Sequence, residues 1–250
     1  MKIGLAIPFY NNGNNLRAEI TKKLFNHYNK IKESLLDYNI DLKICFIGSE
    51  GEISESFCKE FLNNNIYVDF NQDYKDFKLR DKYNKGLQSL GEKDYYCICG
   101  SNDLVFIDSF LSLNNNLNID LIGVKADYEE NNLIVLDYEK KIGFKSSGIY
   151  PPIKIFEVAR YNRIIGGFLA ISKKLFLRLD KKPFFNDWDE VGLESDCVMK
   201  HIPRGFISSK IINIKTDYDI THYDIIKQHH YNGELSESEL SFYLKYLREL

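Results

Sequence analysis

Short apolar runs alternate with amphipathic stretches over the first 120 residues of the chain. Apolar runs of strand length occupy residues 2–9, 42–47, 66–70 and 95–99. The stretches between them place apolar residues at helical spacing, so that one face of each predicted helix is apolar. Strands that alternate with helices in this way predict a mostly parallel sheet with crossover helices, which is an α/β fold.

Three helices are expected in this half. The first is capped by Asn14 or Asn15, and its apolar stripe consists of Leu16, Ile20, Leu24, Tyr28, Ile31 and Leu35. The second runs from Ser54 to about Leu62. The third ends at Gly91, a helix-stopping residue, and its apolar face carries Leu79, Tyr83, Leu87 and Leu90.

The second half of the chain has fewer regular patterns. Leu121–Ala126 and Leu133–Leu136 read as a strand or hairpin at the sheet edge, and residues 138–163 read as a polar loop over a cleft. We expect a strand over Ile164–Ser172 that leads into a helix at Lys173–Leu179, and another strand at Ile211–Ile214. The tail from Glu234 predicts an amphipathic helix that packs on the domain or on a second subunit. Neither an internal repeat nor a low-complexity linker divides the sequence, so we expect a single domain over residues 1–250.

Composition narrows the classes of protein. The formal net charge is −3, so the chain has no global basic field for a polyanion. Five cysteines in irregular spacing fit reduced thiols better than a disulfide framework, and we expect Cys97 and Cys99 to be core thiols. Pro8 and the Asn-rich run after it interrupt any signal peptide, and no apolar run reaches the roughly 20 residues of a membrane helix. We therefore expect a soluble, cytoplasmic protein.

A polar tip, Gly100-Ser101-Asn102-Asp103, follows the apolar run at residues 95–99. Ligands of open α/β sheets bind just past the carboxyl ends of the strands, so a carboxylate at this position is well placed for chemistry. Asp103 is the only carboxylate of the tip, and Asn102 offers an uncharged amide oxygen. The alternative is an ordinary turn, since Gly, Ser, Asn and Asp are common turn residues.

Several motifs in one order resemble the GT-A glycosyltransferases, especially the family-2-like group. They are Ile7-Pro8-Phe9-Tyr10-Asn11 at the first strand end, Lys82-Tyr83-Asn84-Lys85-Gly86 on the helix, and the tip that ends in Asp103. The tip departs from that family's pattern, since Gly or Ser stands where its first Asp would be. The resemblance implies a GT-A (Rossmann-like) fold, a nucleotide-sugar donor, most simply UDP-linked, and Mn²⁺ or Mg²⁺ as cofactor.

The resemblance also implies a nucleotide-binding half over residues 1–120. Tyr10 would stack on the base, and Glu50 would contact the base or ribose. Without a ligand, Tyr10 is only a rim aromatic and Glu50 a carboxylate favoured at a helix N-terminus. The full set of implied donor-binding residues is Pro8, Tyr10, Glu50, Lys82, Asn84, Ser101, Asn102 and Asp103.

For residues 121–232 the resemblance implies an acceptor and metal half, followed by a C-terminal helix at 233–250. The implied general base is Asp196, with Glu194 as second choice, and the implied metal ligands are Asp103 and His222, with the His229–His230 pair competing. The implied acceptor and sugar contacts are Gly166, Gly167, Trp188 and Asp189. A basic stretch, either a solvated loop or a contact for a diphosphate or anionic acceptor, holds Lys141, Lys145, Lys154, Arg160 and Arg163.

The acceptor is a hydroxyl compound that the motifs leave open. The tip at residues 100–103 and a second one, Gly48-Ser49-Glu50-Gly51, also look like those of small, soluble glycosyltransferases of bacteriophages. This resemblance implies a hydroxymethylated pyrimidine in DNA as acceptor and the host cytoplasm as location. A surface-polysaccharide glycosyltransferase is the main rival. A nucleotidyltransferase is a second enzyme class, although a basic Gly-rich phosphate loop near the N-terminus is lacking. A nucleotide-binding module without catalysis is a third class, suggested by the reduced tip.

Overall fold

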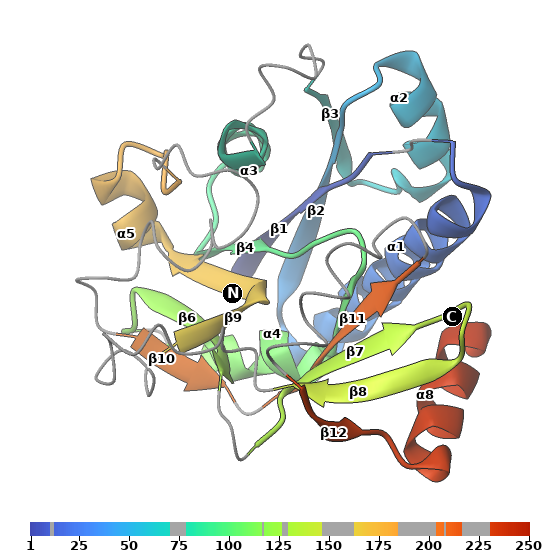
Figure 1. Cartoon of the computed structure of the whole chain (residues 1–250). Coiled ribbons are helices and arrows are strands. Elements are labelled where there is room, and N and C mark those ends of the chain that lie inside the picture. The colour runs from blue at the N-terminus through green and yellow to red at the C-terminus, as the bar shows by residue number, and fades with distance from the viewer. Residues whose placement is uncertain are drawn as a thin grey trace, which may run out of the picture.

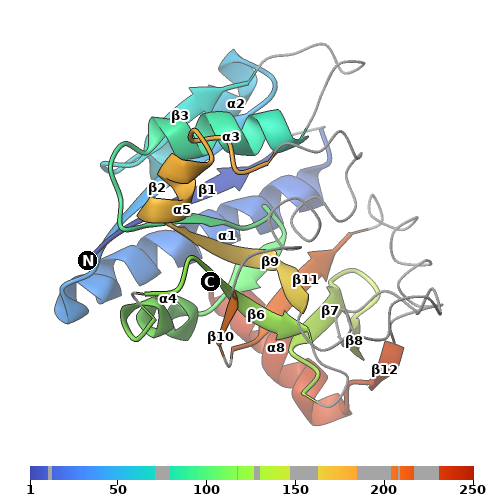
Figure 2. The same cartoon turned by 90° about the vertical axis from the view of Figure 1, so that its left-hand side faces the viewer.

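The computed structural model describes residues 1–10, 13–70, 79–116, 118–126, 130–146, 163–184, 204–207, 209–216 and 231–250. In these ranges the strands form two sheets, and helices flank the larger one (Figures 1 and 2). The predicted α/β architecture with a mostly parallel sheet is therefore confirmed.

The larger sheet has seven strands in the order β10-β6-β9-β4-β1-β2-β3. Four of its neighbouring pairs are parallel, and β9 is antiparallel to both of its neighbours. Its strands are β1 (Lys2–Pro8), β2 (Asp41–Gly48), β3 (Ile66–Asp69), β4 (Tyr95–Ile98), β6 (Leu121–Ala126), β9 (Arg163–Ser172) and β10 (Arg204–Ile207). The strands β4, β1 and β2 are parallel neighbours, so their carboxyl ends lie at the same edge of the sheet. These ends lead into the polar tip, the segment that contains Tyr10 and the segment that contains Glu50.

Helices cover both faces of this sheet, and Figure 2 shows β1 between α1 and α3. Alternate residues of β1 face the two sides, so Leu5 packs in the core cluster that contains α1, whereas Ala6 packs in the cluster that contains α3. The Asn14 side chain caps α1 by accepting from the Arg17 N–H, as predicted. The helices are α1 (Asn15–Leu35), α2 (Glu52–Cys58), α3 (Leu79–Ser89), α4 (Ile107–Asn114), α5 (Lys173–Arg178) and α8 (Glu237–Glu249), with short 3-10 turns at Leu36–Tyr38 and Lys59–Phe61.

The second sheet has five strands in the order β12-β8-β7-β11-β5. They are β5 (Asp103–Val105), β7 (Leu133–Asp137), β8 (Ile142–Ser146), β11 (Ile211–Lys215) and β12 (Tyr231–Glu234). Since β5 begins at the last residue of the polar tip, the tip leads the chain from the first sheet into the second. Figure 1 shows β11 beside β7 in this smaller sheet.

The predictions for the middle of the chain are confirmed in part. The expected strands at Leu121–Ala126 and Leu133–Leu136 are present as β6 and β7, but the hairpin alternative is wrong, because β6 pairs with β9 and β10 while β7 pairs with β8 and β11. β6 is also not at the sheet edge, since β10 lies outside it. Residues 142–146 of the predicted polar loop form β8, which β7 and β12 both pair with.

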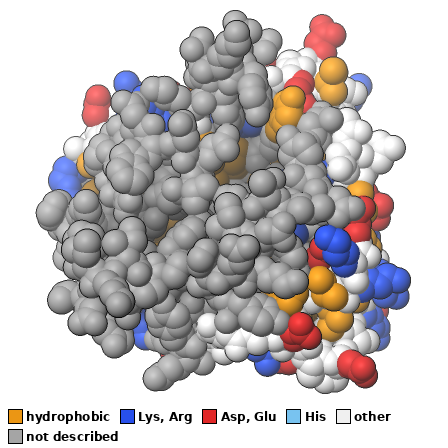
Figure 3. All heavy atoms as spheres, viewed as in Figure 1, with side chains coloured by type: hydrophobic (Ala, Val, Ile, Leu, Met, Phe, Trp, Pro, Cys, Tyr) orange, Lys and Arg blue, Asp and Glu red, His pale blue; other side chains and the backbone are white. Residues whose placement is uncertain are grey.

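The C-terminal helix starts at Glu237 rather than 233, because Ser236 forms a capping box with Glu239 and β12 precedes it. Its apolar residues Tyr243, Leu244 and Leu247 belong to the main core cluster, so the helix packs on its own domain core. Cys97 and Cys99 are buried thiols, as predicted. None of the helices in the described ranges is long and apolar enough to cross a membrane. On the described surface in Figure 3, acidic and basic side chains are interspersed.

Candidate nucleotide-binding site

The ends of β1 and β2 lie side by side, because Pro8 and Ile47 are partners in the parallel register. Pro8 ends β1 and is buried, and Tyr10 beyond it is 47% exposed. Glu50 follows β2 two residues after its last residue. The structure therefore brings an exposed aromatic ring and a carboxylate, both predicted from the sequence, to adjoining strand ends.

Lys82 of α3 ties these two strand ends together. Its Nζ donates to the Phe9 carbonyl and to Ser49 Oγ, each at 2.6 Å. The side chain is buried, and burial lowers the pKa of Lys82 to about 7, against the opposing effects of the Glu50 and Asp69 carboxylates. The structure thus places Lys82 behind the strand ends, where it fixes the loops that carry Tyr10 and Glu50.

The two carboxylate oxygens of Glu50 differ in their hydrogen bonding. The Ser54 hydroxyl donates to Oε2, and the Glu50 N–H donates to Ser54 Oγ at 3.3 Å. Oε1 is buried and lacks a hydrogen-bond partner among the described residues. A buried acceptor left unpaired costs about 1–3 kcal/mol, and more when it is charged. A ligand with an N–H or O–H group at this position would remove that cost.

Asn84, also predicted as a donor contact, binds the main chain. Its Nδ2 donates to the Phe184 carbonyl at 2.7 Å, and the Phe184 N–H donates to Oδ1 at 3.2 Å. Both residues are buried. Asn84 thus anchors the chain at the last described residue before the acidic stretch predicted to hold the general base. Gly86 on the same helix permits close packing, since a Cβ there would lie 2.2 Å from Ile47 Cδ1.

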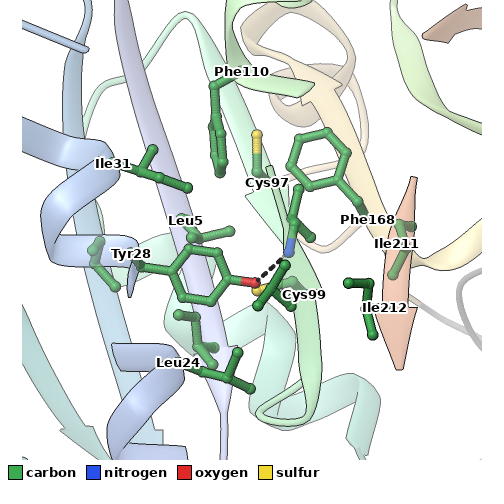
Figure 4. Close-up of a cluster of buried hydrophobic side chains, with 14 of the residues drawn as sticks. Leu5, Leu24, Tyr28, Ile31, Cys97, Cys99, Phe110, Phe168, Ile211 and Ile212 are labelled. Atoms are coloured by element: carbon green, nitrogen blue, oxygen red, sulfur yellow. Dashed lines mark hydrogen bonds between the residues drawn. The ribbon is translucent and has the colours of Figure 1, made fainter. Parts of the chain in front are cut away.

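The Asp103 carboxylate is held from two sides. The Gly100 N–H donates to Oδ2 at 3.0 Å, and Asn213 Nδ2 of β11 donates to Oδ1 at 2.6 Å. The backbone is fixed as well, because the Tyr28 hydroxyl donates to the Asp103 carbonyl at 2.6 Å. Figure 4 shows this hydroxyl among buried apolar side chains, with a dashed line for the bond that it accepts from the Val105 N–H. The tip is therefore rigidly placed, and Asp103 is 8% exposed.

Side-chain oxygens of the tip lie close against Gly100. An ideal Cβ at Gly100 would lie 2.5 Å from Asp103 Oδ2 and 3.1 Å from Asn102 Oδ1, so only glycine lets these two side chains lie this close to the main chain. Hard cations such as Mg²⁺ and Mn²⁺ prefer oxygen ligands, and ligating carboxylates are commonly hydrogen-bonded from outside, as Asp103 is. The tip fits a divalent cation in its donor chemistry, although the described residues contain no group of three or more His, Cys, Asp or Glu that could hold a metal ion.

Arg17 and Ser101 form a contact that the sequence did not indicate. Arg17 lies in the first turn of α1, and its Nη2 donates to Ser101 Oγ at 3.3 Å. Ser101 is buried, so this bond brings a guanidinium to the tip. The sequence carries one indirect sign of this position: the N-cap at Asn14 places the first turn of α1, and so Arg17, just after the end of β1. Ser49, Ser54 and Asn213 were likewise missed, and they too act through partners in other segments.

Gly167 of β9 lies directly against the tip. An ideal Cβ there would lie 2.8 Å from Ile211 Cγ2 and 3.1 Å from Asp103 Cγ, so the small residue lets β9 approach Asp103. Gly166 lies in the same strand. Asp196, Glu194, Trp188, Asp189, His222 and the His229–His230 pair lie outside the described residues, as do Lys154 and Arg160 of the basic stretch. Their predicted roles stay predictions.

Comparisons with known proteins bear on the fold. No protein-family model matches the sequence, and no curated protein matches it either. Among solved structures, the mannosyltransferase PcManGT from Pyrobaculum calidifontis, in complex with GDP-Man and Mn²⁺, aligns with a TM-score of 0.51 at 13% identity and covers 85% of this chain and 56% of that one. S. aureus TarS aligns with a TM-score of 0.53 at 10% identity over 91% of this chain and 64% of that one, and it is also known in complex with UDP-GlcNAc.

A third neighbour belongs to another reaction class. The inositol-1-phosphate CTP transferase from T. maritima aligns with a TM-score of 0.50 at 12% identity, over 90% of this chain and 95% of that one. The chain spans less than two thirds of the length of the PcManGT and TarS structures. Likeness at such identity concerns the fold alone: the chain shares with these proteins an α/β fold of the GT-A type, with a mostly parallel central sheet and flanking helices.

Proposed function

We propose that the protein is a glycosyltransferase that moves a sugar from a nucleotide-sugar, most simply a UDP-sugar, to a hydroxyl acceptor. The observation that carries this proposal is the buried Glu50 Oε1, which lacks a hydrogen-bond partner among the described residues and follows the strand next to the one that ends before the exposed Tyr10. A base would stack on Tyr10 and donate a hydrogen bond to Glu50. Uracil carries such a donor at N3, and a site built to hydrogen-bond a group rejects analogues that lack it.

A cation at the tip and the nearby Arg17 would provide the positive charge that a bound diphosphate needs. Asp103 and Asn102 would hold Mn²⁺ or Mg²⁺, with His222 as a further ligand, and the bound cation supplies Lewis-acid stabilisation of the leaving diphosphate. Arg17, held at the tip by Ser101, adds a fixed guanidinium that suits phosphate oxygens. Lys82 would act from behind by keeping the loops of Tyr10 and Glu50 in position.

The acceptor side rests on residues outside the described ranges. Asp196, or Glu194 in the alternative register, would take the proton of the acceptor hydroxyl, while Trp188 and Asp189 would line the sugar subsite with Gly166 and Gly167 behind it. An aromatic face with carboxylates suits a polyol. Acceptors in keeping with the motifs are a hydroxymethylated pyrimidine of phage DNA and, as the alternative, a growing surface polysaccharide.

A nucleotidyltransferase is the second candidate, and one observation favours it. The T. maritima CTP transferase aligns over 95% of its own length, whereas PcManGT aligns over 56%. The two reactions leave different products: glycosyl transfer releases a nucleoside diphosphate, and nucleotidyl transfer from a nucleoside triphosphate releases pyrophosphate. Product analysis with UDP-sugars and with CTP therefore separates them.

The first experiment measures melting points of the protein with UDP, GDP, CMP and TDP, each with Mn²⁺ and with EDTA. Since a ligand that binds only the native state raises the melting point, we expect the largest rise with UDP and Mn²⁺. Asp103→Ala should abolish the dependence on metal. Glu50→Gln should weaken UDP binding about tenfold or more, because a hydrogen bond to a charged group is worth roughly 1.5–3 kcal/mol.

Glu52→Gln is the matched control for the Glu50 variant. Glu52 is exposed in the first turn of α2, the helix that follows Glu50, so the variant removes the same charge two residues away. It should bind UDP like the wild type. If no nucleotide shifts the melting point, the donor-site assignment is wrong. If UDP binds tightly but no sugar is transferred or hydrolysed, the protein is a nucleotide-binding module.

A further inference from the structure

Two buried side-chain atoms in the described residues lack a hydrogen-bond partner, and both lie at the candidate site. One is Glu50 Oε1, and the other is Asn213 Oδ1. Buried polar atoms are nearly always paired in folded proteins, so each exception calls for an explanation. The base-binding role proposed for Glu50 accounts for the first. The second, on β11, has no part in the function proposed above.

Asn213 is a polar residue in an otherwise apolar part of its strand. β11 reads Ile-Ile-Asn-Ile-Lys, and asparagine is disfavoured in strands. In the antiparallel pairing of β11 with β5, Asn213 is the direct partner of Asp103. The main chain reinforces this register, because the Ile214 N–H donates to the Asn102 carbonyl at 2.8 Å. The register therefore places one amide side chain against the one carboxylate of the tip.

The two ends of the amide have different surroundings. Nδ2 donates to Asp103 Oδ1 at 2.6 Å, which fixes the orientation of the carboxylate. Oδ1 of the same amide is buried without a partner among the described residues. Since Nδ2 and Oδ1 belong to one rigid planar group, holding Asp103 also fixes Oδ1 near the tip. An amide oxygen in this position accepts a hydrogen bond from an O–H group.

We propose that Asn213 is a positioning residue for Asp103 and that its Oδ1 accepts a hydrogen bond from an O–H donor bound at the tip. That donor is either a water molecule on the divalent cation or a hydroxyl of the nucleotide. This inference rests on the proposed function, because it assumes that the tip binds cation and nucleotide. The tip has one carboxylate, Asp103, where the motif that it resembles has more than one. Asn213, on a strand of the second sheet, supplies the amide that orients this carboxylate.

The test compares the rise in melting point that Mn²⁺ causes in the wild type, Asn213→Ala and Asn213→Asp. Removing an outer partner of a metal ligand typically weakens metal binding 10- to 100-fold, so Asn213→Ala should show a smaller rise than the wild type. Asn213→Asp places a second carboxylate against Asp103. The repulsion should lower its melting point without cation, and Mn²⁺ should restore it, so this variant should show the largest rise.

The order Asn213→Asp, wild type, Asn213→Ala is not expected from a purely structural asparagine, because loss of packing is not repaired by a cation. Asn63→Asp is the control: Asn63 is exposed, and the variant adds the same charge away from the tip. Its Mn²⁺ response should equal that of the wild type. If Asn213→Ala does not fold, the rise in melting point that Mn²⁺ causes in Asn213→Asp, compared with that of the wild type, still tests the proposal.

Separate arms identify the O–H donor. A weaker response of Asn213→Ala to Mn²⁺ alone indicates a cation-bound water, and a weaker response to UDP in EDTA indicates a nucleotide hydroxyl. Equal responses of all three proteins, with the wild type responding, would overturn this inference and leave the proposed function standing. A wild type that responds to neither cation nor nucleotide would overturn both.

Discussion

At the scale of single residues, the site depends on a buried ammonium. Lys82 Nζ makes two hydrogen bonds of 2.6 Å to groups on different strand ends, one of them a main-chain carbonyl. Burial lowers the pKa of Lys82 to about 7, which means that the folded state disfavours the charged form relative to the unfolded chain. The lysine thus holds the ends of β1 and β2 together at a cost that depends on pH.

This cost predicts how stability varies with pH. Below pH 7 Lys82 is charged in both states and the full penalty applies. Between about pH 7 and the unfolded value of 10.5 the unfolded chain binds the extra proton, so stability should rise with pH, with a limiting slope of about 1.4 kcal/mol per pH unit. Lys82→Met should lack this rise. Urea unfolding of both proteins between pH 6.5 and 9 measures the difference.

Lys85→Met is the control for this prediction, since Lys85 is exposed on the same helix. Its stability should follow the wild-type pH curve. Buried thiols also make stability depend on pH. Burial raises the pKa of Cys45 to about 12, so its contribution to stability falls as pH increases above 9. All the variants share this contribution, and it cancels when their curves are compared. Parallel curves for wild type and Lys82→Met would contradict the assignment of a buried, titrating lysine.

Sequence patterns found some of these residues and missed others, for a physical reason. Tyr10, Glu50 and Asp103 stand just past apolar runs, so their place at strand ends follows from local pattern. Arg17 and Asn213 act on partners 84 and 110 positions away in sequence, and no local pattern reports such contacts. The motif that contains Lys82 was recognised, yet only the fold reveals that its ammonium faces inward.

At the scale of elements, α1 holds the strand that follows the tip. The Tyr28 hydroxyl donates to the Asp103 carbonyl and accepts from the Val105 N–H, so one side chain pairs two main-chain groups of β5. Tyr28 is fully buried, and its phenol pKa is raised well above its usual value because burial disfavours the ionised form. The hydroxyl therefore remains a neutral hydrogen-bonding group that fixes a three-residue strand.

Tyr28→Phe should lower the free energy of unfolding by about 1–3 kcal/mol, because it leaves buried main-chain groups of β5 unpaired. Tyr38→Phe removes the same hydroxyl from a residue that is 56% exposed and should change stability by less than about 0.5 kcal/mol. Denaturant unfolding of the two variants measures both values. Equal effects would show that the Tyr28 hydroxyl does not support β5.

The elements also show which predictions local patterns support. β1, α1 and α3 were predicted because each carries enough periodic residues to reveal its type. β5 and β10 have three and four residues, and they exist through pairing with β11 and β6, which lie far away in sequence. The hairpin prediction failed for the same reason: two apolar runs with a polar turn between them say nothing of the partners, β9 and β11, that each run prefers.

At the scale of the whole molecule, the two sheets share a hydrophobic core. One cluster of buried residues contains Leu5 of β1, Phe168 of β9, Ile212 of β11 and Leu247 of α8. A shared core implies that neither sheet keeps its packing when the other unfolds. We therefore propose that residues 1–250 form a single domain, as the sequence predicts.

A single domain should unfold in one cooperative transition. We expect far-UV circular dichroism and tyrosine fluorescence to report the same melting point, and the calorimetric and van't Hoff enthalpies of unfolding to agree. Two separated transitions, or a stable fragment of residues 1–120 after limited proteolysis, would contradict the single-domain proposal.

The anchor between Asn84 and Phe184 has a consequence for how such a protein evolves. The Asn84 side chain forms hydrogen bonds with the main-chain N–H and carbonyl of Phe184, and Tyr83 packs on the Phe184 ring. Neither contact depends on the residues that follow. If the proposed function holds, substitutions in the chain beyond Phe184 could alter the choice of acceptor while the anchor at Asn84 keeps the start of that segment in place.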